Sequence, residues 1–410
     1  MRCRHCQSYL KLRFADLGSA PPSNAYLTHQ NIHGLEKWFP LRVLVCEECW
    51  LVQTEDFAEA ADLFDANYAY FSGFSTSWLL HSERYVSDAV LRFSLNEKSH
   101  VVEVAANDGY LLQFVKERNI PCTGVEPTAS TAAAARAKGI DIVEDFFGVR
   151  LAHELAAQGK CADLTAANNV LAHVPDINDF VAGFCILLKP DGVATFEFPH
   201  VLRLISENQF DTIYHEHFSY LSLTAVQRIF DANGLVVFDV QQLSTHGGSL
   251  RIFAQRADTG SHPVNAKVSS LLQQEDEAGL RSSAGYEGFQ LAAEKIKDDF
   301  VAFLIEAKRR GKTVAAYGAA AKGNTLINFS GVRPDLIRYV VDKNPSKEGK
   351  FMPGSRIPIV GERHLQEGTP DYVVILPWNL LTEIKLQLKY IENWGGQFVT
   401  AVPALRVFPA

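Results

Sequence analysis

From residue 99 onward the sequence alternates short apolar runs with helix-forming segments, and this alternation constrains the fold more than any other feature. Apolar runs such as HVVEVAAN, CTGVEP and IDIVEDFF are followed by helix-forming stretches such as YLLQFVKERN and TASTAAAARAKG. This order is typical of a parallel sheet with helices on both faces. Further on, LVVFDVQQL and SLRIFAQR flank the turn-like STHGG, which predicts an antiparallel hairpin at a sheet edge.

A second alternating α/β unit occupies the C-terminal third of the chain. It opens with the amphipathic helix GFQLAAEKIKDDFVAFLIEAKRRG and continues with the strands TVAAYGA, LIRYVVD, DYVVILP and GQFVTAVP. Between the two units, residues 258 to 283 are polar, and we expect a linker or an exposed helix there. Because 410 residues are too many for one ordinary core, two or three domains are expected.

Four of the seven cysteines, namely Cys3, Cys6, Cys46 and Cys49, lie in the first 50 residues. Two Cys-x-x-Cys pairs supply four thiolates on two knuckles, which is the usual donor set of a closed structural zinc site. The odd total argues against a disulfide framework, although unligated thiols and a redox pair remain alternatives. We expect a small domain here that needs the metal to fold.

The charge and hydropathy patterns argue against two classes of partner. The formal net charge is -8 and no long basic run occurs, so we expect no nucleic-acid partner. No apolar stretch approaches the roughly 20 residues that span a bilayer, and the N-terminus MRCRHCQSYLKLRF lacks the apolar core of a signal peptide. We therefore expect a cytoplasmic protein with no membrane partner.

Polar residues follow each of the first four strands of the middle unit, where a parallel sheet binds its ligands. The first turn is not Gly-x-Gly-x-x-Gly, so a loop that cradles pyrophosphate is poorly supported. Acids and aromatic faces suit S-adenosylmethionine, which carries a ribose, an adenine and a sulfonium cation but no phosphate. A dinucleotide and acids that only cap helices remain alternatives. The candidate cofactor-binding residues are Glu103, Asn107, Asp108, Gly109, Glu126, Pro127, Asp145, Phe146, Asn168 and Asn169.

The segment Tyr214-His215-Glu216-His217 follows the fifth strand and therefore belongs to the same edge of the sheet. On an extended segment both imidazoles would point one way and the carboxylate the other. This spacing differs from the i, i+4 pair of helical zinc sites, and a third ligand would still be needed. Proton transfer is favoured because histidine is a base near neutral pH; a metal site and a structural network remain alternatives. His173, after the fourth strand, faces the same cleft or caps a turn.

The series of motifs resembles the sugar C-methyltransferases that act on nucleotide-linked 4-keto-deoxysugars. After the two Cys-x-x-Cys pairs it runs YAYFSGFSTSWLLHSERY, EVAANDGYLL, GVEPT, NNVLAHVPD, TFEFPH, YHEHFSYLS, THGGSLR and YGAAAKGNTLIN. The resemblance covers nearly the whole chain in order, and it is the series rather than any single motif that is specific.

The resemblance implies an α/β protein of three domains. These are a zinc-binding domain at residues 1–80, a class I, Rossmann-like methyltransferase domain with a terminal antiparallel hairpin at 81–257, and a C-terminal Rossmann-like domain at 258–410 that binds the nucleotide sugar. It also implies the chemistry: a base removes the proton beside the keto group, and the resulting carbanion, expected at C3, takes the methyl group of S-adenosylmethionine.

Roles for individual residues follow from the resemblance. His217 would be the base, with Tyr214 and Glu216 in support, His173 near the ketone, and Tyr68 or Tyr70 near the reacting methyl. The expected substrate-binding residues are His246, Ser249, Arg251, Gly318, Lys322 and Asn324.

Two of these assignments have alternatives in the sequence itself. Arg251 lies on a strand and can instead pair with an acid. The loop from Gly318 to Asn324 can meet a phosphate through its amides, but it can equally be a dinucleotide loop or a plain helix start. An NAD-dependent dehydrogenase that uses this loop and a non-enzymatic zinc-ribbon scaffold therefore remain alternative functions.

Overall fold

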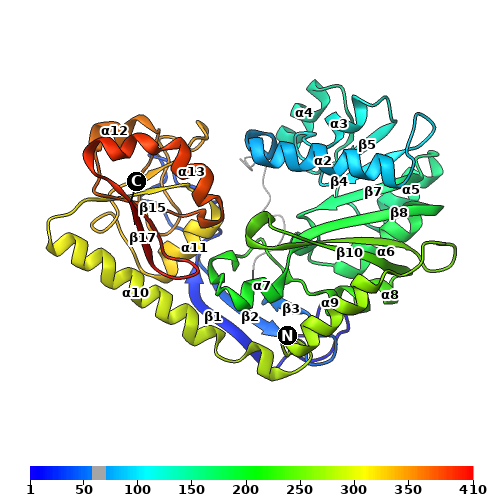
Figure 1. Cartoon of the computed structure of the whole chain (residues 1–410), viewed down its shortest axis with the longest axis horizontal. Helices are drawn as coiled ribbons and strands as arrows, with labels where there is room; N and C mark the ends of the chain where they lie inside the picture. The colour runs from blue at the N-terminus through cyan, green and yellow to red at the C-terminus, as the bar shows by residue number, and fades with distance from the viewer. Residues whose placement is uncertain (58–70, 410) are drawn as a thin grey trace.

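The computed structural model describes residues 1–57 and 71–409, which form three sheets with helices packed around them (Figure 1). The fold is mixed α/β, as the alternating pattern predicts. Among the described helices, none is both long enough and apolar enough to cross a membrane. Tyr68 and Tyr70 lie outside the described residues, so their expected place near the reacting methyl stays a prediction.

The first sheet is antiparallel and has the order β1-β2-β3-β9. Its second and third strands coincide with the strand-like runs FPLRVLV and LVQT, whereas Asp16 and Gly18 interrupt the apolar pattern of the first strand, where the pairing shifts register. The fourth strand, β9, comes from the segment directly after His217. The N-terminal sheet is therefore completed by the segment of the middle unit that carries the predicted base. Its strands are β1 (Leu12–Ala20), β2 (Phe39–Val45), β3 (Val52–Thr54) and β9 (Ser219–Tyr220).

The second sheet has seven strands in the order β10-β11-β8-β7-β4-β5-β6. Strands β4 to β8 are parallel, whereas β11 runs antiparallel to both of its neighbours. The predicted hairpin is confirmed, but only β10 forms the edge, because β11 pairs along its length with β8. The strands are β4 (Val101–Val104), β5 (Cys122–Val125), β6 (Asp141–Val143), β7 (Ala162–Asn168), β8 (Leu188–Pro199), β10 (Leu235–Leu243) and β11 (Ser249–Arg256).

Helices pack on both faces of this sheet (Figure 1). They are α2 (Thr76–Arg92), α3 (Leu112–Lys116), α4 (Ala129–Ala137), α5 (Val149–Ala157), α6 (Ile177–Leu187) and α8 (Leu223–Ala232). Helix α7 (Val201–Ser206) instead buries Val201 and Leu204 in the cluster that contains Val43 of the first sheet. Four short 3-10 turns lie near the candidate site described below: η1 (Ser72–Phe74), η2 (Leu171–His173), η3 (Phe210–Thr212) and η4 (Thr245–Gly247).

The polar region between the two α/β units forms the helix α9 (Ala266–Glu277), followed by the turn η5 (Ser283–Tyr286). One face of α9 is buried against the seven-stranded sheet through Val268 and Leu271. Its Glu275 is fully buried and accepts hydrogen bonds from His200 Nε2 and the amide of Leu223, each at 2.7 Å. The sequence predicts a linker or an exposed helix here. The structure instead has a half-buried helix that continues the middle unit.

The third sheet has the order β14-β13-β12-β15-β16-β17 and is parallel except for β17. Its strands are β12 (Val314–Tyr317), β13 (Val340–Val341), β14 (Ile359–Val360), β15 (Tyr372–Ile375), β16 (Gln397–Thr400) and β17 (Arg406–Pro409). The helices and turns are α10 (Phe289–Arg309), α11 (Ala321–Phe329), α12 (Arg363–Gly368), η6 (Trp378–Leu380), α13 (Leu381–Gln387) and η7 (Lys389–Trp394). The long helix α10 leads from the middle unit along this sheet (Figure 1).

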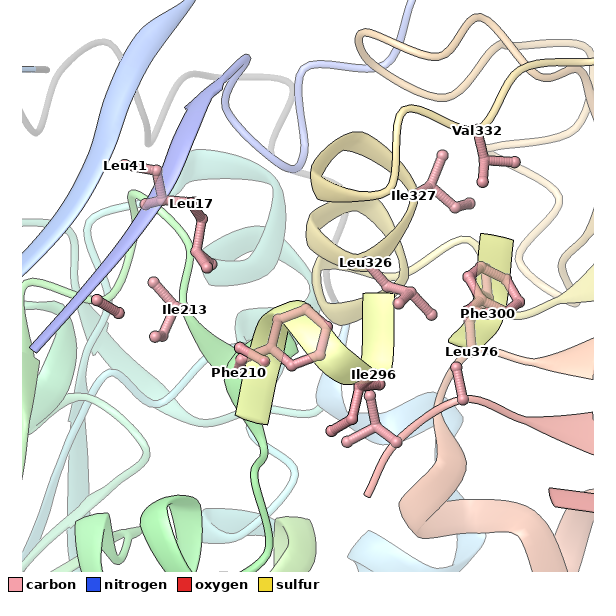
Figure 2. Close-up of a cluster of buried hydrophobic side chains, with 14 of the residues drawn as sticks. Leu17, Leu41, Phe210, Ile213, Ile296, Phe300, Leu326, Ile327, Val332 and Leu376 are labelled. Carbon is pink, nitrogen blue, oxygen red and sulfur yellow. The ribbon is translucent and has the colours of Figure 1, made fainter. Parts of the chain in front are cut away.

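The largest hydrophobic core is shared between the two ends of the chain. Leu17 and Leu41 of the first sheet belong to the same buried cluster as Phe210 and Ile213, which precede His217 in the chain (Figure 2). The C-terminal unit adds buried side chains from α10, α11 and the loop after β15, namely Ile296, Phe300, Leu326, Ile327 and Leu376. The segment before His217 is therefore packed between the N-terminal sheet and the C-terminal unit.

Candidate active site

The four N-terminal cysteines form one cluster, as the spacing predicts. Their sulfur atoms all lie within 4.8 Å of one another, with 3.5 Å between Cys3 and Cys49 and 3.4 Å between Cys6 and Cys46. Zinc–sulfur bonds of about 2.3 Å in a tetrahedron place the sulfurs about 3.8 Å apart, so this cluster fits Zn²⁺. Gln53 Nε2 lies 3.2 Å from Cys3 Sγ and donates to it, as groups behind a metal ligand commonly do.

Strand β4 carries, one residue before its end, a buried carboxyl group that lacks a strong partner. Glu103 is fully buried, and desolvation, followed by the nearby charges of Asp108 and Glu126, raises its pKa well above the ordinary value. The Tyr110 hydroxyl lies close enough to lower that pKa. Neither Glu103 oxygen has a well-formed hydrogen bond to a described residue. A buried acceptor of this kind suits the hydroxyl groups or the cation of a ligand.

Glu126, after β5, joins the first two loops of the edge. Its Oε2 accepts from the Asn107 amide at 2.9 Å, and its Oε1 accepts from the Thr128 amide and the Thr131 hydroxyl, each at 3.0 Å. Pro127 follows it and is half-buried. Because a carboxylate offers about four acceptor positions, one remains for a ligand hydroxyl. Glu126 therefore both shapes the loop and can bind the ribose.

The remaining predicted cofactor residues divide into buried and exposed ones. Asn169, after β7, has its Nδ2 3.1 Å from His246 Nε2, which ties this loop to η4, and its neighbour Asn168 is buried. Gly109 has a φ of +74°, and a Cβ there would lie 2.3 Å from Ile140 Cδ1, so no other residue fits. Asp145 and Phe146, after β6, are more open: Asp145 pairs with Arg150 at 2.5 Å, and Phe146 is 60% exposed.

His217 is held in one neutral tautomer by two hydrogen bonds. Its Nδ1 lies 2.9 Å from the Thr212 carbonyl oxygen, which only accepts, so Nδ1 carries the proton. Its Nε2 lies 2.7 Å from the Tyr214 hydroxyl and is the acceptor. Burial, followed by the proximity of His173, holds the pKa of His217 well below the ordinary value. The imidazole is therefore a neutral base with its lone pair on Nε2.

Other basic side chains converge on His217 from separate elements. The ring of His173, in η2, makes an edge contact at a centroid distance of 4.7 Å, and burial lowers the pKa of His173 to about 4. The charges of Lys322 of α11 and His246 of η4 also depress the pKa of His217. Burial lowers the pKa of His246 to about 4. His173 thus contacts His217, and Lys322 contacts His246, although the sequence separates these four predicted site residues by up to 149 positions.

The neighbours of His217 face the N-terminal sheet instead. His215 Nε2 lies 3.3 and 3.2 Å from the carbonyl oxygens of Phe39 and Pro40, and Glu216 Oε1 accepts from Asn24 Nδ2 at 3.1 Å. The expectation that both imidazoles point the same way is wrong. The segment is a turn, in which the His217 amide donates to the Tyr214 carbonyl at 2.9 Å, rather than a strand. Burial raises the pKa of Glu216 to about 7.

The C-terminal loop directs its lysine toward the middle unit. Lys322 Nζ lies 3.3 Å from the His246 carbonyl oxygen, 3.2 Å from Asn379 Oδ1 and 4.7 Å from the centre of the Trp378 ring. Burial lowers the pKa of Lys322, while Asp211 raises it. The lysine therefore bridges the two α/β units beside the basic cluster.

The rest of this segment is occupied by contacts within its own unit and with the N-terminal unit, since the Ala319 carbonyl accepts from the Tyr26 hydroxyl at 2.6 Å. The Ala319 amide donates to Asp342 Oδ2 at 2.8 Å. Gly318 has a φ of +92°, and a Cβ there would lie 2.5 Å from Pro377 Cδ, so close packing requires glycine. Asn324 is buried, and its Oδ1 accepts from Asn328. Lys322 is thus the member of this loop that is best placed for a substrate.

Arg251 pairs with an acid, which is the alternative that the sequence left open. Its Nη2 donates to Glu197 Oε2 at 2.6 Å, and His81 Nε2 lies 2.9 Å from the same oxygen. These partners lower the pKa of the buried Glu197 against the effect of desolvation. Ser249, at the start of β11, donates to the Thr245 carbonyl at 2.9 Å.

Sequence reasoning missed part of this neighbourhood. Glu197 lies near the end of β8 and had a signal, since it is in the motif TFEFPH at the ligand-binding edge. Trp78 and His81 had a signal too, in the motif YAYFSGFSTSWLLHSERY, but their place on α2, outside the strand-end loops, gave no reason to assign them a role. The Trp78 ring lies 5.1 Å from His246 and 5.9 Å from Tyr110 between ring centres, so it covers the same edge.

Family models match nearly the whole chain in three parts. They describe a candidate zinc binding domain at residues 3–64, a methyltransferase domain at 78–240, and a C-methyltransferase C-terminal domain at 244–403. Together with the seven-stranded sheet and the cysteine cluster, these matches define a zinc-binding, S-adenosylmethionine-dependent methyltransferase.

A curated relative gives the particular family. The chain is 34% identical over 409 residues to the C-methyltransferase NovU of Streptomyces niveus, a match that covers 100% of this chain and 97% of that one. The protein belongs to the C-methyltransferase family. Neither the dehydrogenase nor the scaffold alternative gains support from these relatives.

Two solved structures with similar folds each cover just under half of the chain. The magnesium protoporphyrin IX methyltransferase of Synechocystis, with bound SAH, is 16% identical, covers 43% of this chain and 83% of its own, and has a TM-score of 0.35. A S-adenosylmethionine-dependent methyltransferase from Clostridium acetobutylicum is 10% identical, covers 45% and 92%, and has a TM-score of 0.36. These values are too low to support an argument about function.

Proposed function

We propose that the protein methylates the carbon, C3, beside the keto group of a nucleotide-linked 4-keto-deoxysugar, with His217 as the general base. The observation that carries this proposal is the state of His217. A buried, neutral imidazole whose Nε2 accepts from the Tyr214 hydroxyl is suited to remove a proton from carbon once that hydroxyl turns to the substrate. The sheet edge proposed to bind the cofactor lies beside it, because Asn169 of that edge contacts His246.

The proposed reaction begins with proton removal. The 4-keto group acidifies the adjacent C–H bond, and Nε2 of His217 takes that proton while the electron pair moves toward the ketone oxygen. S-adenosylmethionine supplies an electrophilic methyl group. The enolate carbon forms the new C–C bond, so the products are the methylated sugar, S-adenosylhomocysteine and a proton on His217.

The residues around the base fit the charge that develops. An enolate oxygen is stabilised by donors and cations held in place in a water-poor site. The Lys322 ammonium group can supply positive charge beside this cluster, and the Tyr214 hydroxyl, 2.7 Å from Nε2, can orient the base or donate to the enolate oxygen. His173 lies on the other side of the imidazole and is neutral near pH 7, because its pKa is about 4.

The substrate class rests on the resemblance to sugar C-methyltransferases and on the bridge between the two α/β units. Lys322 reaches from the C-terminal unit to η4 of the middle unit, where a bound sugar would contact both. His246, Ser249, Arg251, Gly318 and Asn324 complete the proposed substrate side of the site. We also propose a cytoplasmic location.

The variant His217→Asn tests the base. The expected kcat is lower by about two or more orders of magnitude, the usual scale for loss of a general base, with the affinity for S-adenosylmethionine nearly unchanged. The matched control is His153→Asn, an exposed histidine on α5, which should keep wild-type turnover. Near-wild-type kcat in His217→Asn would show that His217 is not the general base.

A mass-spectrometric screen of nucleotide-linked 4-keto sugars for the gain of one methyl group tests the substrate class. Deuterium exchange tests the order of steps. With S-adenosylhomocysteine bound, the keto sugar should gain deuterium at the adjacent carbon in deuterated water, and His217→Asn should suppress this gain. A methylated product without any such exchange would contradict proton removal before methyl transfer.

A further inference from the structure

The first zinc knuckle contacts the catalytic loops directly through Arg4. This residue lies between Cys3 and Cys6, and it is buried, with 8% of its surface exposed. Its Nη1 donates to the Pro175 carbonyl at 3.1 Å, two residues beyond His173. Its guanidinium carbon lies 5.2 Å from the centre of the Phe218 ring, next to His217. One side chain of the metal knuckle therefore touches the neighbourhoods of both histidines.

Thr54, the last residue of β3, holds the backbone of the base. Its hydroxyl donates to the His217 carbonyl oxygen, and its amide donates to the Phe218 carbonyl at 3.1 Å. The carbonyl of Thr54 in turn accepts from Arg4 Nη2 at 3.0 Å. Thr54 is buried, so these hydrogen bonds do not compete with water.

Gln53 completes the connection to the metal ligands. Its side chain accepts from the Arg4 amide at 2.9 Å and donates to Cys3 Sγ at 3.2 Å. Its backbone pairs with Ser219 in the β3–β9 ladder. A continuous path of short contacts thus runs from a cysteine thiolate to the strand that follows His217.

We propose that Arg4, Gln53 and Thr54 are positioning residues for the base, and that the bound zinc fixes His217 through them. This inference rests on the proposed role of His217. Proton transfer requires the base within hydrogen-bond reach of the C–H bond, and a misplacement of about 1 Å can cost about a hundredfold in rate. Zinc fixes Cys3 and Cys6, and Arg4 between them is fixed as a result. Arg4 holds the segment that carries His173 through the Pro175 carbonyl, and it holds the segment that carries His217 through Thr54.

The variants Thr54→Val and Thr54→Ser test the hydroxyl. Valine keeps the shape but loses the donor, and kcat should fall about ten- to a hundredfold while KM for S-adenosylmethionine stays within about twofold. Serine restores the donor and should regain most of the rate. The matched control is Thr28→Val in a surface turn of the same domain, which should leave kcat unchanged.

The same experiment separates the two proposals. If His217→Asn retains turnover, the proposed function fails. If His217→Asn is inactive but Thr54→Val has wild-type kcat, the positioning role fails. A fall in Thr54→Val that serine does not repair also contradicts it, because loss of the hydroxyl is then not the cause.

Amide hydrogen exchange of the full-length protein tests the part played by zinc without an activity measurement. Removal of zinc with a chelator should raise the exchange rate of a peptide covering residues 213–221 at least about tenfold, because β9 loses the strand that holds it. A peptide covering β4, residues 101–104, should keep its rate. An unchanged 213–221 peptide, or an equal increase in both peptides, would overturn the proposal.

Discussion

The two halves of the active site are built differently. The proposed cofactor edge is local: the partners of Glu126 are Asn107, Thr128 and Thr131, all within 20 positions of it. The proposed catalytic segment 209–220 depends on distant parts of the chain. If these assignments hold, the difference teaches that the proposed cofactor loops are shaped mainly within the middle unit, whereas the proposed base is placed by contacts from all three units.

Contacts from both flanking domains make the catalytic segment non-local. From the N-terminal side, Asn24 binds Glu216. From the C-terminal side, the Thr325 hydroxyl donates to the Ile213 carbonyl at 2.8 Å, and Trp378 Nε1 donates to the buried Asp211 at 2.7 Å. Substitutions in the flanking domains should therefore reduce kcat and leave cofactor affinity intact, and substitutions at the cofactor edge should do the reverse.

The largest effect is expected from Cys46→Ser, which removes a zinc ligand. The metal should be lost, kcat should fall at least about a hundredfold because the base is no longer held, and the affinity for S-adenosylmethionine should change by less than about threefold. Metal analysis, steady-state kinetics and calorimetry measure the three quantities. The control is Cys161→Ser, a half-buried cysteine outside the cluster. Wild-type kcat in a zinc-free Cys46→Ser protein would contradict the claim that the zinc-binding domain holds the base in place.

Glu126→Gln should show the opposite pattern. The amide keeps the shape but loses the charge that strengthens hydrogen bonds to the loop amides and the ribose. A loss of about 1.5 to 3 kcal/mol corresponds to roughly ten- to a hundredfold weaker S-adenosylmethionine binding by calorimetry. At saturating cofactor, kcat should stay close to wild type. Glu117→Gln, an exposed glutamate of the same domain, is the control, and equal effects in both variants would contradict the assignment.

A smaller effect concerns the pH dependence of stability. Glu216 has an ordinary pKa of 4.5 that burial raises to about 7, so the folded protein keeps a proton that the unfolded chain releases. The stability from this group is complete below pH 4.5 and is lost as the pH rises toward 7. Glu216→Gln removes that dependence, so wild-type Tm should fall relative to the variant between pH 5 and 7. Parallel Tm curves would show that Glu216 does not titrate in this range.

The smallest effect is expected from Asp145→Ala. Its partner Arg150 has 62% of its side chain exposed, and exposed ion pairs contribute at most about 1 kcal/mol. We expect S-adenosylmethionine affinity to change by less than about threefold, compared with the larger loss in Glu126→Gln. Calorimetry on both variants compares how much Asp145 and Glu126 contribute to S-adenosylmethionine binding. An equal loss of affinity would show that Asp145 contributes as much as Glu126.

The sequence predicted the local half of the site better than the non-local half. Polar residues after successive strands located the loops of the cofactor edge, because strand-end position is a property of the local pattern. The strand β9 has two residues and no periodic signal of its own, so its pairing with β3 was not predictable. The partners Asn24 and Thr54 lie 192 and 163 positions from the residues they bind, a distance at which a single sequence carries no pattern.

The prediction that both histidine side chains point the same way failed for a related reason. Alternation of side chains holds on a strand, but the segment from Tyr214 to His217 forms a turn that packs against β2 and α11. Tertiary contacts, rather than local preference, set that conformation. The residue chosen as the base nevertheless faces His173, and its neighbour His215 binds backbone carbonyls of the N-terminal domain.

The shared core of Figure 2 has a consequence for how such proteins can be inherited. Leu17 and Leu41, near the start of the chain, are buried in the same cluster as Phe300 and Ile327, near its end. A recombination event that replaced only the C-terminal third would leave Leu17 and Leu41 facing side chains that had changed independently of them. Exchange between relatives should therefore be tolerated best when both ends of the gene come from the same parent.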